Sequence, residues 1–478
     1  METQWRVGPS EWGEAIASVD GPQLIVAGPG TGKTEFLVRR ARHLIESGQA
    51  APAEVLILTF SRRAAGEIAR RTTSPGRDAI ASRTATSPVV TTFHSFAHRL
   101  LEAHGPEFYG WQRTPTLLTG PEQVALVSEL LSNEDPQAWP ILYRSLLFSP
   151  TLSDEVADFL LRCQERLLSP GDIKERSMHH PQWRALPDFM KRYARELEAR
   201  ERIDYGGLLA MAAALLDQPR IAESIARQHR YILVDEYQDT SPAQVRLLER
   251  ATLSHRNLTV SGDPYQSVYS FRGAELANVS DFCERFRGLD GTPARRLILT
   301  TSFRVPAAIL AGALRVVATG DLPGAAGSVT PADHPGRVEA YVFDQASAEA
   351  EWISGQIERM RVEENLKFAH IGVFSRSSRH FLPELSRALE RRRIPHNTPD
   401  RRLVDHPAVR VIFDLVEAAQ LEAPNTPNVD MSLLVEQSDR VMRRLLLGPL
   451  FAMSLSAERA LLRRRRRTGH SWREILIN

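Results

Sequence analysis

Cysteine is scarce in this chain of 478 residues: Cys163 and Cys283 are the only two, and they lie far apart. Zinc and iron–sulfur sites need closely spaced cysteines, and a disulfide framework needs several of them, so the sequence predicts none of these. Long apolar runs are also missing, because none reaches the roughly 18 residues of a membrane span. The first ten residues are polar, unlike a signal peptide. We therefore expect a cytoplasmic protein without a membrane partner.

Lysine is the second scarce residue. There are 4 lysines against 56 arginines, and the net charge is only +2. Total charge therefore predicts no acidic partner, and nucleic-acid binding would require local basic patches. The composition, with 42% hydrophobic and 25% charged residues, is that of a globular protein. The length is typical of about three domains.

Short apolar runs alternate with helical patterns in two parts of the chain. The runs at 22–28, 54–60 and 88–96 predict strands, and helical spacing follows the first two. Further runs at 231–236, 257–263 and 295–303 predict that the same sheet resumes. Alternation of this kind indicates a parallel sheet covered by helices, which is an α/β fold.

Helical patterns without a clear strand fill residues 101–202, and we interpret them as a helical insertion. We therefore assign 1–100 and 203–285 to the first α/β domain. A small-residue stretch at 320–329 predicts a loop, and runs at 337–343 and 370–376 predict strands of a second, partial α/β domain over 286–410. Residues 411–478 are expected to be helices.

The stretch AGPGTGKT follows a predicted strand and opens a predicted helix, which is the context of a phosphate-binding loop. Glycines let backbone N–H groups approach phosphate oxygens, and the helix N-terminus adds positive potential. Lys33 is expected to reach the β- and γ-phosphates, and Thr34 to hold Mg²⁺. The predicted nucleotide contacts in this loop are Ala27, Gly28, Pro29, Gly30, Thr31, Gly32, Lys33 and Thr34.

The stretch ILVDEYQDT supplies two adjacent acids at the end of an apolar strand. Asp235 can hold Mg²⁺ there, and Glu236 can orient or deprotonate an attacking water. Adjacent exposed acids are common at strand ends, but together with a phosphate loop they predict Mg²⁺-dependent hydrolysis of ATP or GTP.

These motifs, with LTFSRRAAGEI, TTFHSF, VDEYQDTSPAQ, SGDPYQSVYSFRGA and TTSFRVP, resemble superfamily 1 DNA helicases of the UvrD/Rep type in order and spacing. The resemblance covers about residues 7–420. It implies two RecA-like domains, each with a helical insertion, ATP and Mg²⁺ as cofactors, and 3′–5′ movement on single-stranded DNA or at single-/double-strand junctions. DNA repair or recombination is the implied setting.

The resemblance also implies roles for residues outside the phosphate loop. Gln238 and Gln266 match γ-phosphate sensors, and Arg272 and Arg304 match arginines that stabilise transition-state charge. Arg304 is expected to come from the second domain and to act when the cleft closes; an ordinary surface arginine is the alternative. Phe303 takes the place of a tyrosine that stacks on adenine.

A DNA track is implied in the same way. The matching residues are Thr59, Phe60, Arg63, Thr92, Phe93, His94, Tyr269 and Phe271. Aromatic rings grip every base through its π-face, and Arg63 can meet a phosphate. Such aromatics can instead be core residues, which remains an open alternative for Phe60, and His94 can be a structural hydrogen-bonding residue.

Two departures from the family pattern stand out. Trp12 occupies the position of a glutamine that reads adenine, so it either stacks on a base or packs. The last two helicase motifs have no match, so we expect a chain truncated within the second insertion, with a second subunit or downstream chain supplying them. Either the chain is a DNA-dependent ATPase, or it is a remnant that binds ATP and DNA without unwinding. A small-molecule kinase is disfavoured, since no phosphoacceptor site is recognisable.

Five consecutive arginines, Arg463–Arg467, first suggest a nucleic-acid-binding tail. The residues on both sides have apolar positions at helical spacing, however. We therefore expect one or two helices here, with the arginines mostly on solvated faces.

Overall fold

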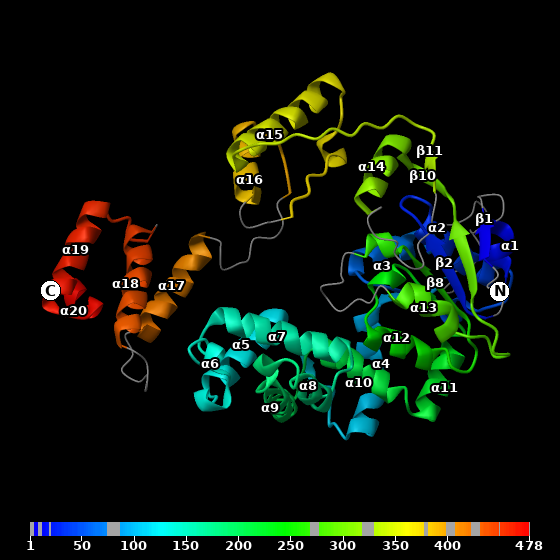
Figure 1. The fold of residues 1–478 in the computed structure, drawn as a ribbon, viewed down its shortest axis with the longest axis horizontal. Helices are drawn as coiled ribbons and strands as arrows, with labels where there is room; N and C mark the ends of the chain where they lie inside the picture. Colours follow the sequence, from blue (N-terminus) through cyan, green and yellow to red (C-terminus); the bar gives the residue numbers. More distant parts are fainter. Residues whose placement is uncertain are drawn as a thin grey trace. The chain divides into compact units, whose positions relative to one another are not determined.

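The computed structural model describes residues 4–7, 12–18, 21–73, 87–267, 277–317, 329–376, 381–397, 407–421, 431–448 and 450–477. The chain divides into two compact units, Met1–Glu339 and Ala340–Asn478. The first unit contains the parallel sheet and runs from blue to green in Figure 1, and the second, from yellow to red, is built from helices.

A parallel sheet of seven strands forms the centre of the first unit, in the order β1-β9-β2-β8-β7-β3-β4. Its strands are β1 (Gln4–Val7), β2 (Gln23–Ala27), β3 (Val55–Thr59), β4 (Val89–Thr92), β7 (Tyr231–Val234), β8 (Leu258–Gly262) and β9 (Arg295–Leu299). The register pairs Val26 with Gly262 and Leu58 with Val234, so these strands end together at one edge. The predicted α/β fold with a parallel sheet is confirmed.

Helices cover both faces of the sheet, because successive residues of a strand point to opposite faces. In β7, Tyr231 and Leu233 pack with α2 and α3, whereas Ile232 and Val234 pack with α4, α10, α12 and α13. Strands β3 and β7 are buried at every position, as expected for a sheet covered on both sides. The helices are α1 (Trp12–Ala17), α2 (Lys33–Glu46), α3 (Arg62–Thr73), α4 (Phe93–Tyr109), α10 (Tyr205–Leu215), α11 (Pro219–Gln228), α12 (Pro242–Ala251) and α13 (Ala277–Arg285).

The prediction of a strand over 88–96 is correct only for β4. Helix α4 begins at Phe93 because Thr92 caps it: the Thr92 hydroxyl accepts a hydrogen bond from the Ser95 N–H at 3.2 Å. A strong N-cap therefore ends the strand four residues earlier than the apolar pattern suggests.

Residues between α4 and α10 form the expected helical insertion with its own core, built around Phe189, Tyr193 and Leu160. Its helices are α5 (Gly120–Ser132), α6 (Ile141–Arg144), α7 (Pro150–Glu165), α8 (Pro170–Arg176) and α9 (Leu186–Ala199). The only strands there among the described residues are the two-residue pair β5 (Thr116–Leu117) and β6 (Arg202–Ile203). Figure 1 shows this insertion in cyan and green, with α5 and α7 above α8 and α9.

The predicted strand over 295–303 is two strands. β9 lies in the main sheet between β1 and β2, although the sequence assigns residues from 286 onward to a second domain. Its apolar residues Leu297, Ile298 and Leu299 are buried there. β10 (Thr301–Pro306) is followed in the chain by α14 (Ala307–Val317). β10 pairs with β11 (Thr330–Ala332) in a separate two-stranded sheet.

The second unit has helices but no strand among its described residues. The predicted strands over 337–343 and 370–376 are wrong: neither segment contains a strand, and Val342 and Phe374 are 95% and 96% exposed. A strand requires a paired neighbour, and neither segment has one among the described residues. The helices are α15 (Ala346–Glu363), α16 (Phe381–Arg391), α17 (Pro407–Leu421), α18 (Met431–Leu447), α19 (Leu455–Thr468) and α20 (Trp472–Ile477), which confirms the helices expected after residue 411.

Candidate functional site

The carboxyl edge of the sheet gathers the residues of the two main motifs. β2 leads into the loop 27–34, and β7, two strands away across β8, leads into Asp235 and Glu236. Gly30 and Gly32 have φ values of 73° and 92°, a left-handed conformation that favours glycine. The Gly28 carbonyl accepts hydrogen bonds from the Thr31 N–H and hydroxyl at 3.3 and 2.8 Å. The loop therefore curls around its own backbone and opens α2 at Lys33.

Thr34 and Asp235 meet across this edge, and both are predicted ligands of Mg²⁺. The Thr34 hydroxyl donates to a carboxylate oxygen of Asp235 at 2.9 Å. Ser261, on β8, donates to the other carboxylate oxygen at 2.9 Å. Burial, followed by the negative charge of Glu236, raises the pKa of Asp235. A divalent cation beside this carboxylate would offset that unfavourable charge, so the oxygen pair fits a hard metal ion.

Lys33 and Glu236 form an ion pair, with 2.9 Å between the ammonium and a carboxylate oxygen. Glu236 has φ 54°, a left-handed conformation that costs a non-glycine residue about 1 kcal/mol or more. Backbone strain at an acid beside a phosphate loop is typical of functional residues, since the surrounding structure must hold it there. Asp235 and Glu236 are adjacent in sequence, yet Glu236 faces the loop lysine and Asp235 faces Thr34.

Gln238 and Gln266 connect this ion pair to the end of β8. The Gln238 amide donates to Glu236 at 2.8 Å, and its oxygen accepts the Asp263 N–H at 3.0 Å. Gln266 donates to the Asp263 carboxylate at 2.7 Å and accepts from Lys33 at 3.3 Å. Both glutamines predicted as phosphate sensors therefore contact the Lys33–Glu236 pair.

Strand β10 lies directly against the phosphate loop. The Ser302 hydroxyl donates to the Pro29 carbonyl at 2.9 Å, and the Phe303 N–H donates to the Gly30 carbonyl at 2.9 Å. A Cβ added at Gly30 would lie 3.2 Å from the Cβ of Arg304. Arg304 thus belongs to the same unit as the loop, which corrects the expectation that it approaches only from a second domain. Backbone hydrogen bonds to the loop hold β10 in place.

Trp12 packs beside the loop and is only 5% exposed. Its ring lies edge-to-face against Phe36 and Phe303, with centroid distances of 5.9 and 6.0 Å. A Cβ at Gly32 would come within 2.8 Å of the Trp12 ring. Of the two alternatives for Trp12, the structure shows packing, whereas Phe303 is 54% exposed and leaves a ring face open to solvent.

The predicted DNA track is only partly at the surface. Phe93 is 1% exposed and lies in the main core, so the expectation that it stacks on or wedges between bases is wrong. Phe60 is half-buried against Phe93, with ring centroids 5.6 Å apart. Thr59 and Thr92 are buried at the strand ends. Phe93 is buried because it begins helix α4, which packs on the core, so of these four residues only Phe60 is not fully buried.

Arg63 is exposed in the first turn of α3, as expected for a phosphate contact. His94 is mostly buried, with its ring edge-to-face against Tyr205 at 5.5 Å. Burial lowers the pKa of His94 to about 4, so the imidazole is neutral near pH 7. The predicted residues Tyr269, Phe271 and Arg272 lie outside the described residues.

Sequence reasoning gives no role to three polar residues of this site, Ser261, Asp263 and Ser302, although they lie within the motifs SGDPYQSVYSFRGA and TTSFRVP. Each is nearly or fully buried and bonded to a residue of the predicted site. Ser261 and Asp263 occur at the end of a predicted strand, which is a signal that sequence reasoning could have used. Ser302 sits inside an apolar strand pattern and gives no such signal.

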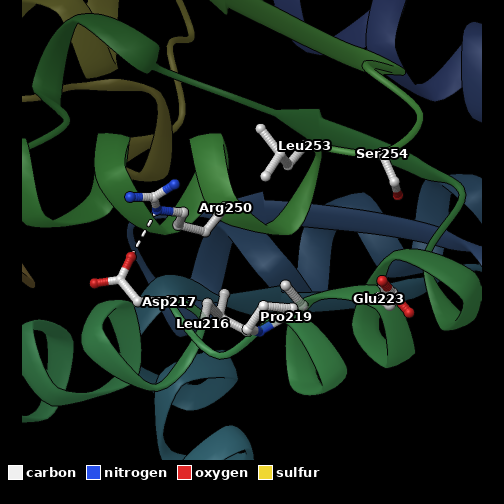
Figure 2. Close-up of a pocket in the computed structure, with 8 residues that line it drawn as sticks. Leu216, Asp217, Pro219, Glu223, Arg250, Leu253 and Ser254 are labelled. Atoms are coloured by element: carbon white, nitrogen blue, oxygen red, sulfur yellow. Dashed lines mark ion pairs between the residues drawn. The ribbon is translucent and has the colours of Figure 1, made fainter.

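A cavity of about 410 Å³ opens elsewhere, between the start of α11 and the end of α12 (Figure 2). Leu216, Pro219 and Leu253 line it, and an ion pair of 2.6 Å joins Asp217 to Arg250 at its side. No predicted site residue lines this cavity. Among the described residues there is no group of three or more acids, histidines or cysteines arranged to hold a metal, and no helix has the length and apolarity to cross a membrane.

Comparison with known proteins gives consistent matches. Residues 10–287 match the family model described as UvrD/REP helicase N-terminal domain. The chain is 28% identical over 372 residues to the ATP-dependent DNA helicase PcrA of Bacillus subtilis, covering 76% of this chain and 46% of that protein. It is 30% identical over 310 residues to the PcrA of Staphylococcus aureus, covering 64% of this chain and 39% of that protein. The chain thus spans about half the length, or less, of the curated relatives it matches.

Proposed function

The chain belongs to the UvrD/REP helicase family, and we propose that it is the ATP-hydrolysing part of a motor that moves on single-stranded DNA. The relatives are named ATP-dependent DNA helicases. For this chain we propose DNA unwinding at single-/double-strand junctions, 3′–5′ polarity, and a role in repair or recombination. Both cysteines are buried, and two widely separated cysteines are typical of a reducing compartment such as the cytoplasm.

The observation that carries the proposal is the meeting of two motifs that are about 200 residues apart. Thr34 bonds Asp235, and Lys33 pairs with Glu236, each at 2.9 Å. Mg²⁺ bound by Thr34 and Asp235 would supply charge neutralisation for the nucleotide phosphates. Lys33 binds the β- and γ-phosphates, and the loop N–H groups orient them.

Glu236 acts on the attacking water in this proposal. When the Lys33 ammonium binds the γ-phosphate instead of Glu236, the Glu236 carboxylate no longer has this ion-pair partner and can act as a general base. Gln238 keeps that carboxylate oriented through its hydrogen bond of 2.8 Å. Arg304, which lies on β10, stabilises the charge that develops on the transferred γ-phosphate. Arg272 serves the same role by family resemblance.

The DNA path is proposed to pass over the exposed residues at the strand ends. Arg63 meets a phosphate, and Phe60 presents its half-buried ring edge. Tyr269 and Phe271 are proposed stacking residues by resemblance alone. Gln266 links this path to hydrolysis because it contacts Lys33 and directly precedes Ser267, whose hydroxyl bonds Asp239 at 3.3 Å.

A second candidate is a protein that binds ATP and DNA without unwinding. It is favoured by the segments 337–343 and 370–376, which form no strands and expose Val342 and Phe374. A motor needs two rigid bodies that move against each other, whereas a binding protein needs only the first unit.

Steady-state ATP turnover with and without a single-stranded oligonucleotide tests the main proposal. We expect stimulation by the oligonucleotide and complete loss of turnover in Lys33→Ala. Lys191→Ala is a matched control, since Lys191 is exposed on α9 and pairs only with Asp188. Turnover that single-stranded DNA does not stimulate would refute the motor and leave the binding protein.

A further inference from the structure

Asp204 lies at the seam between the helical insertion and the sheet of the first unit. It directly follows β6 and is the N-cap residue of α10, a helix of the main core. Its side chain is fully buried, with 0% exposure. A carboxylate is costly to bury unless hydrogen-bond donors surround it, so the partners of Asp204 show what this residue holds together.

The two carboxylate oxygens of Asp204 have different partners. Oδ1 accepts a hydrogen bond from the Gly207 N–H at 2.7 Å, which is an ordinary N-cap contact. Oδ2 accepts hydrogen bonds from the Tyr193 hydroxyl at 2.7 Å, the Gln164 amide at 3.0 Å and the Gln123 amide at 3.3 Å. These three donors lie on α9, α7 and α5, all in the insertion. Capping explains Oδ1 alone, whereas Oδ2 joins three helices of the insertion to the start of α10.

The partners of Asp204 that the structure describes are all neutral donors. Such a set fits an ionised carboxylate, which can only accept hydrogen bonds. Burial raises the pKa of the Tyr193 hydroxyl, and the negative charge of Asp204 raises that pKa further, so the hydroxyl keeps its proton and remains a donor. The link between the insertion and α10 is therefore intact whenever Asp204 is ionised.

Two glycines bring the insertion close to this seam, where α7 lies alongside the start of α10 (Figure 1). A Cβ at Gly206 would lie 2.7 Å from the Cβ of Gln164, which is closer than side chains pack. A Cβ at Gly207 would lie 2.8 Å from the Asp204 carboxylate. Only residues without a side chain allow this approach. The stretch DYGG therefore combines a cap with the space that α7 needs.

Tyr205, the first residue of α10, extends the seam to the carboxyl edge of the sheet. Its ring lies edge-to-face against the ring of His94, with centroids 5.5 Å apart. His94 is in the first turn of α4, just after the end of β4, and β4 pairs with β3, whose end precedes Phe60. The insertion thus holds Asp204, and Asp204 fixes the residue that packs against His94.

We propose that Asp204 is a positioning residue that couples the helical insertion to the His94 edge of the sheet by holding Tyr205 in place. Without the Oδ2 contacts, the insertion and the start of α10 separate more easily, and His94 becomes accessible. The coupling stands on the contacts alone. Its effect on DNA rests on the proposed function, in which DNA passes over the strand ends beside His94.

Asp204→Ser separates the two oxygens, because a serine hydroxyl caps a helix but offers no counterpart of Oδ2. The first measurement is the rate of histidine modification by diethyl pyrocarbonate in the full chain, without nucleotide or DNA, followed by peptide mass spectrometry. We expect the rate at His94 to rise about tenfold, as when local opening is eased by the loss of one or two hydrogen bonds. His229, buried just before β7, reports general loosening and should keep its rate.

Two further variants make this measurement specific. Tyr193→Phe removes one donor to Oδ2 and leaves the cap intact, so it should raise the His94 rate by a smaller factor. Asp135→Ser changes an exposed N-cap residue of the insertion and should leave the rate unchanged. An unchanged His94 rate in Asp204→Ser overturns the coupling. An equal rise at His229 also overturns it, because Asp204 would then only stabilise the fold.

The second measurement is ATP turnover against the concentration of a single-stranded oligonucleotide. We expect Asp204→Ser to raise the concentration for half-maximal stimulation about tenfold, with KM for ATP and unstimulated turnover unchanged. A purely structural residue gives no such split, since loss of folded protein lowers every rate together. A parent chain without stimulation refutes the proposed function, while the His94 rate still decides the coupling. Stimulation with the same half-saturation in parent and variant overturns the effect on DNA.

Discussion

The Lys33 ammonium lies 2.9 Å from the Glu236 carboxylate, so the residue expected to hold phosphate is neutralised by the residue expected to activate water. A γ-phosphate and Glu236 compete for one ammonium. Nucleotide binding requires Lys33 to leave Glu236, whereas hydrolysis requires the Glu236 carboxylate. Substitutions at Glu236 should therefore affect binding and hydrolysis differently.

Glu236→Gln should retain nucleotide binding and lose hydrolysis. The amide cannot accept the proton of water, and loss of a general base lowers turnover by about 10²- to 10⁴-fold. Nucleotide affinity should be equal or higher, because Lys33 no longer pairs with a carboxylate. Equilibrium binding of a fluorescent ATP analogue and single-turnover hydrolysis measure the two effects. Loss of binding in this variant would contradict the role given to Glu236, and Glu198→Gln is an exposed control.

Thr34→Val should raise the Mg²⁺ concentration needed for half-maximal turnover by about tenfold or more, as expected when one oxygen near the metal is lost. The change keeps the side-chain shape and removes the hydroxyl that meets Asp235 at 2.9 Å. Thr34→Ser keeps the hydroxyl and should behave like the parent chain. A Mg²⁺ titration of ATP turnover measures the shift, and an identical titration for Val and Ser would count against Thr34 as a ligand.

Ser302→Ala should lower kcat more than it raises KM. The hydroxyl joins β10 to the phosphate loop through Pro29 and accepts the Val305 N–H at 3.1 Å, so its loss frees the strand that carries Arg304. We expect a fall in kcat of about tenfold and a cost of about 1 kcal/mol in unfolding free energy. Ser280→Ala, at a partly buried position of α13 outside the site, is the control. A variant that loses stability but keeps kcat would reduce Ser302 to a packing role.

The chain should discriminate weakly between ATP and GTP. By family resemblance Trp12 takes the place of a glutamine, and its buried ring packs on Gly32 rather than offering a paired donor and acceptor to a base. We expect kcat/KM values for the two nucleotides within about tenfold, the range that hydrophobic contacts alone can discriminate. Competition between the nucleotides in one assay measures the ratio. A ratio above a thousandfold would show that another group reads the base.

Acid should destabilise the first unit through His94. Burial lowers the pKa of His94 to about 4, below the unfolded value near 6.5, so the unfolded chain binds the extra proton first. The stability contributed by neutral His94 is fully present above about pH 6.5 and is lost as the pH falls toward 4. At pH 5.5 the loss of unfolding free energy is about 1 kcal/mol. Urea unfolding at pH 7.5 and 5.5 should show a smaller loss for His94→Asn than for the parent chain. Equal losses would mean that His94 does not contribute.

Much of the fold and the centre of the site could be predicted from residues alone. The phosphate loop is a single short stretch of chain, so its glycines and Lys33 can be recognised from the sequence alone. Asp235 and Glu236 follow an apolar strand, and parallel strands bring their carboxyl ends to one edge. The helices of 101–202 and α19 followed from periodicity, which is a local property.

Tertiary structure decided the features that depend on contacts between distant residues. Phe93 is a core residue because Thr92 starts α4 and turns the ring inward, and no spacing rule separates that ring from a surface one. Segments 337–343 and 370–376 have the apolar pattern of strands but pair with no strand among the residues that the structure describes. Arg304 lies beside the phosphate loop because Ser302 and Phe303 bond residues more than 270 positions away. Sequence thus determines which groups can do chemistry, whereas pairing across the sheet and burial decide which of them meet and which remain accessible.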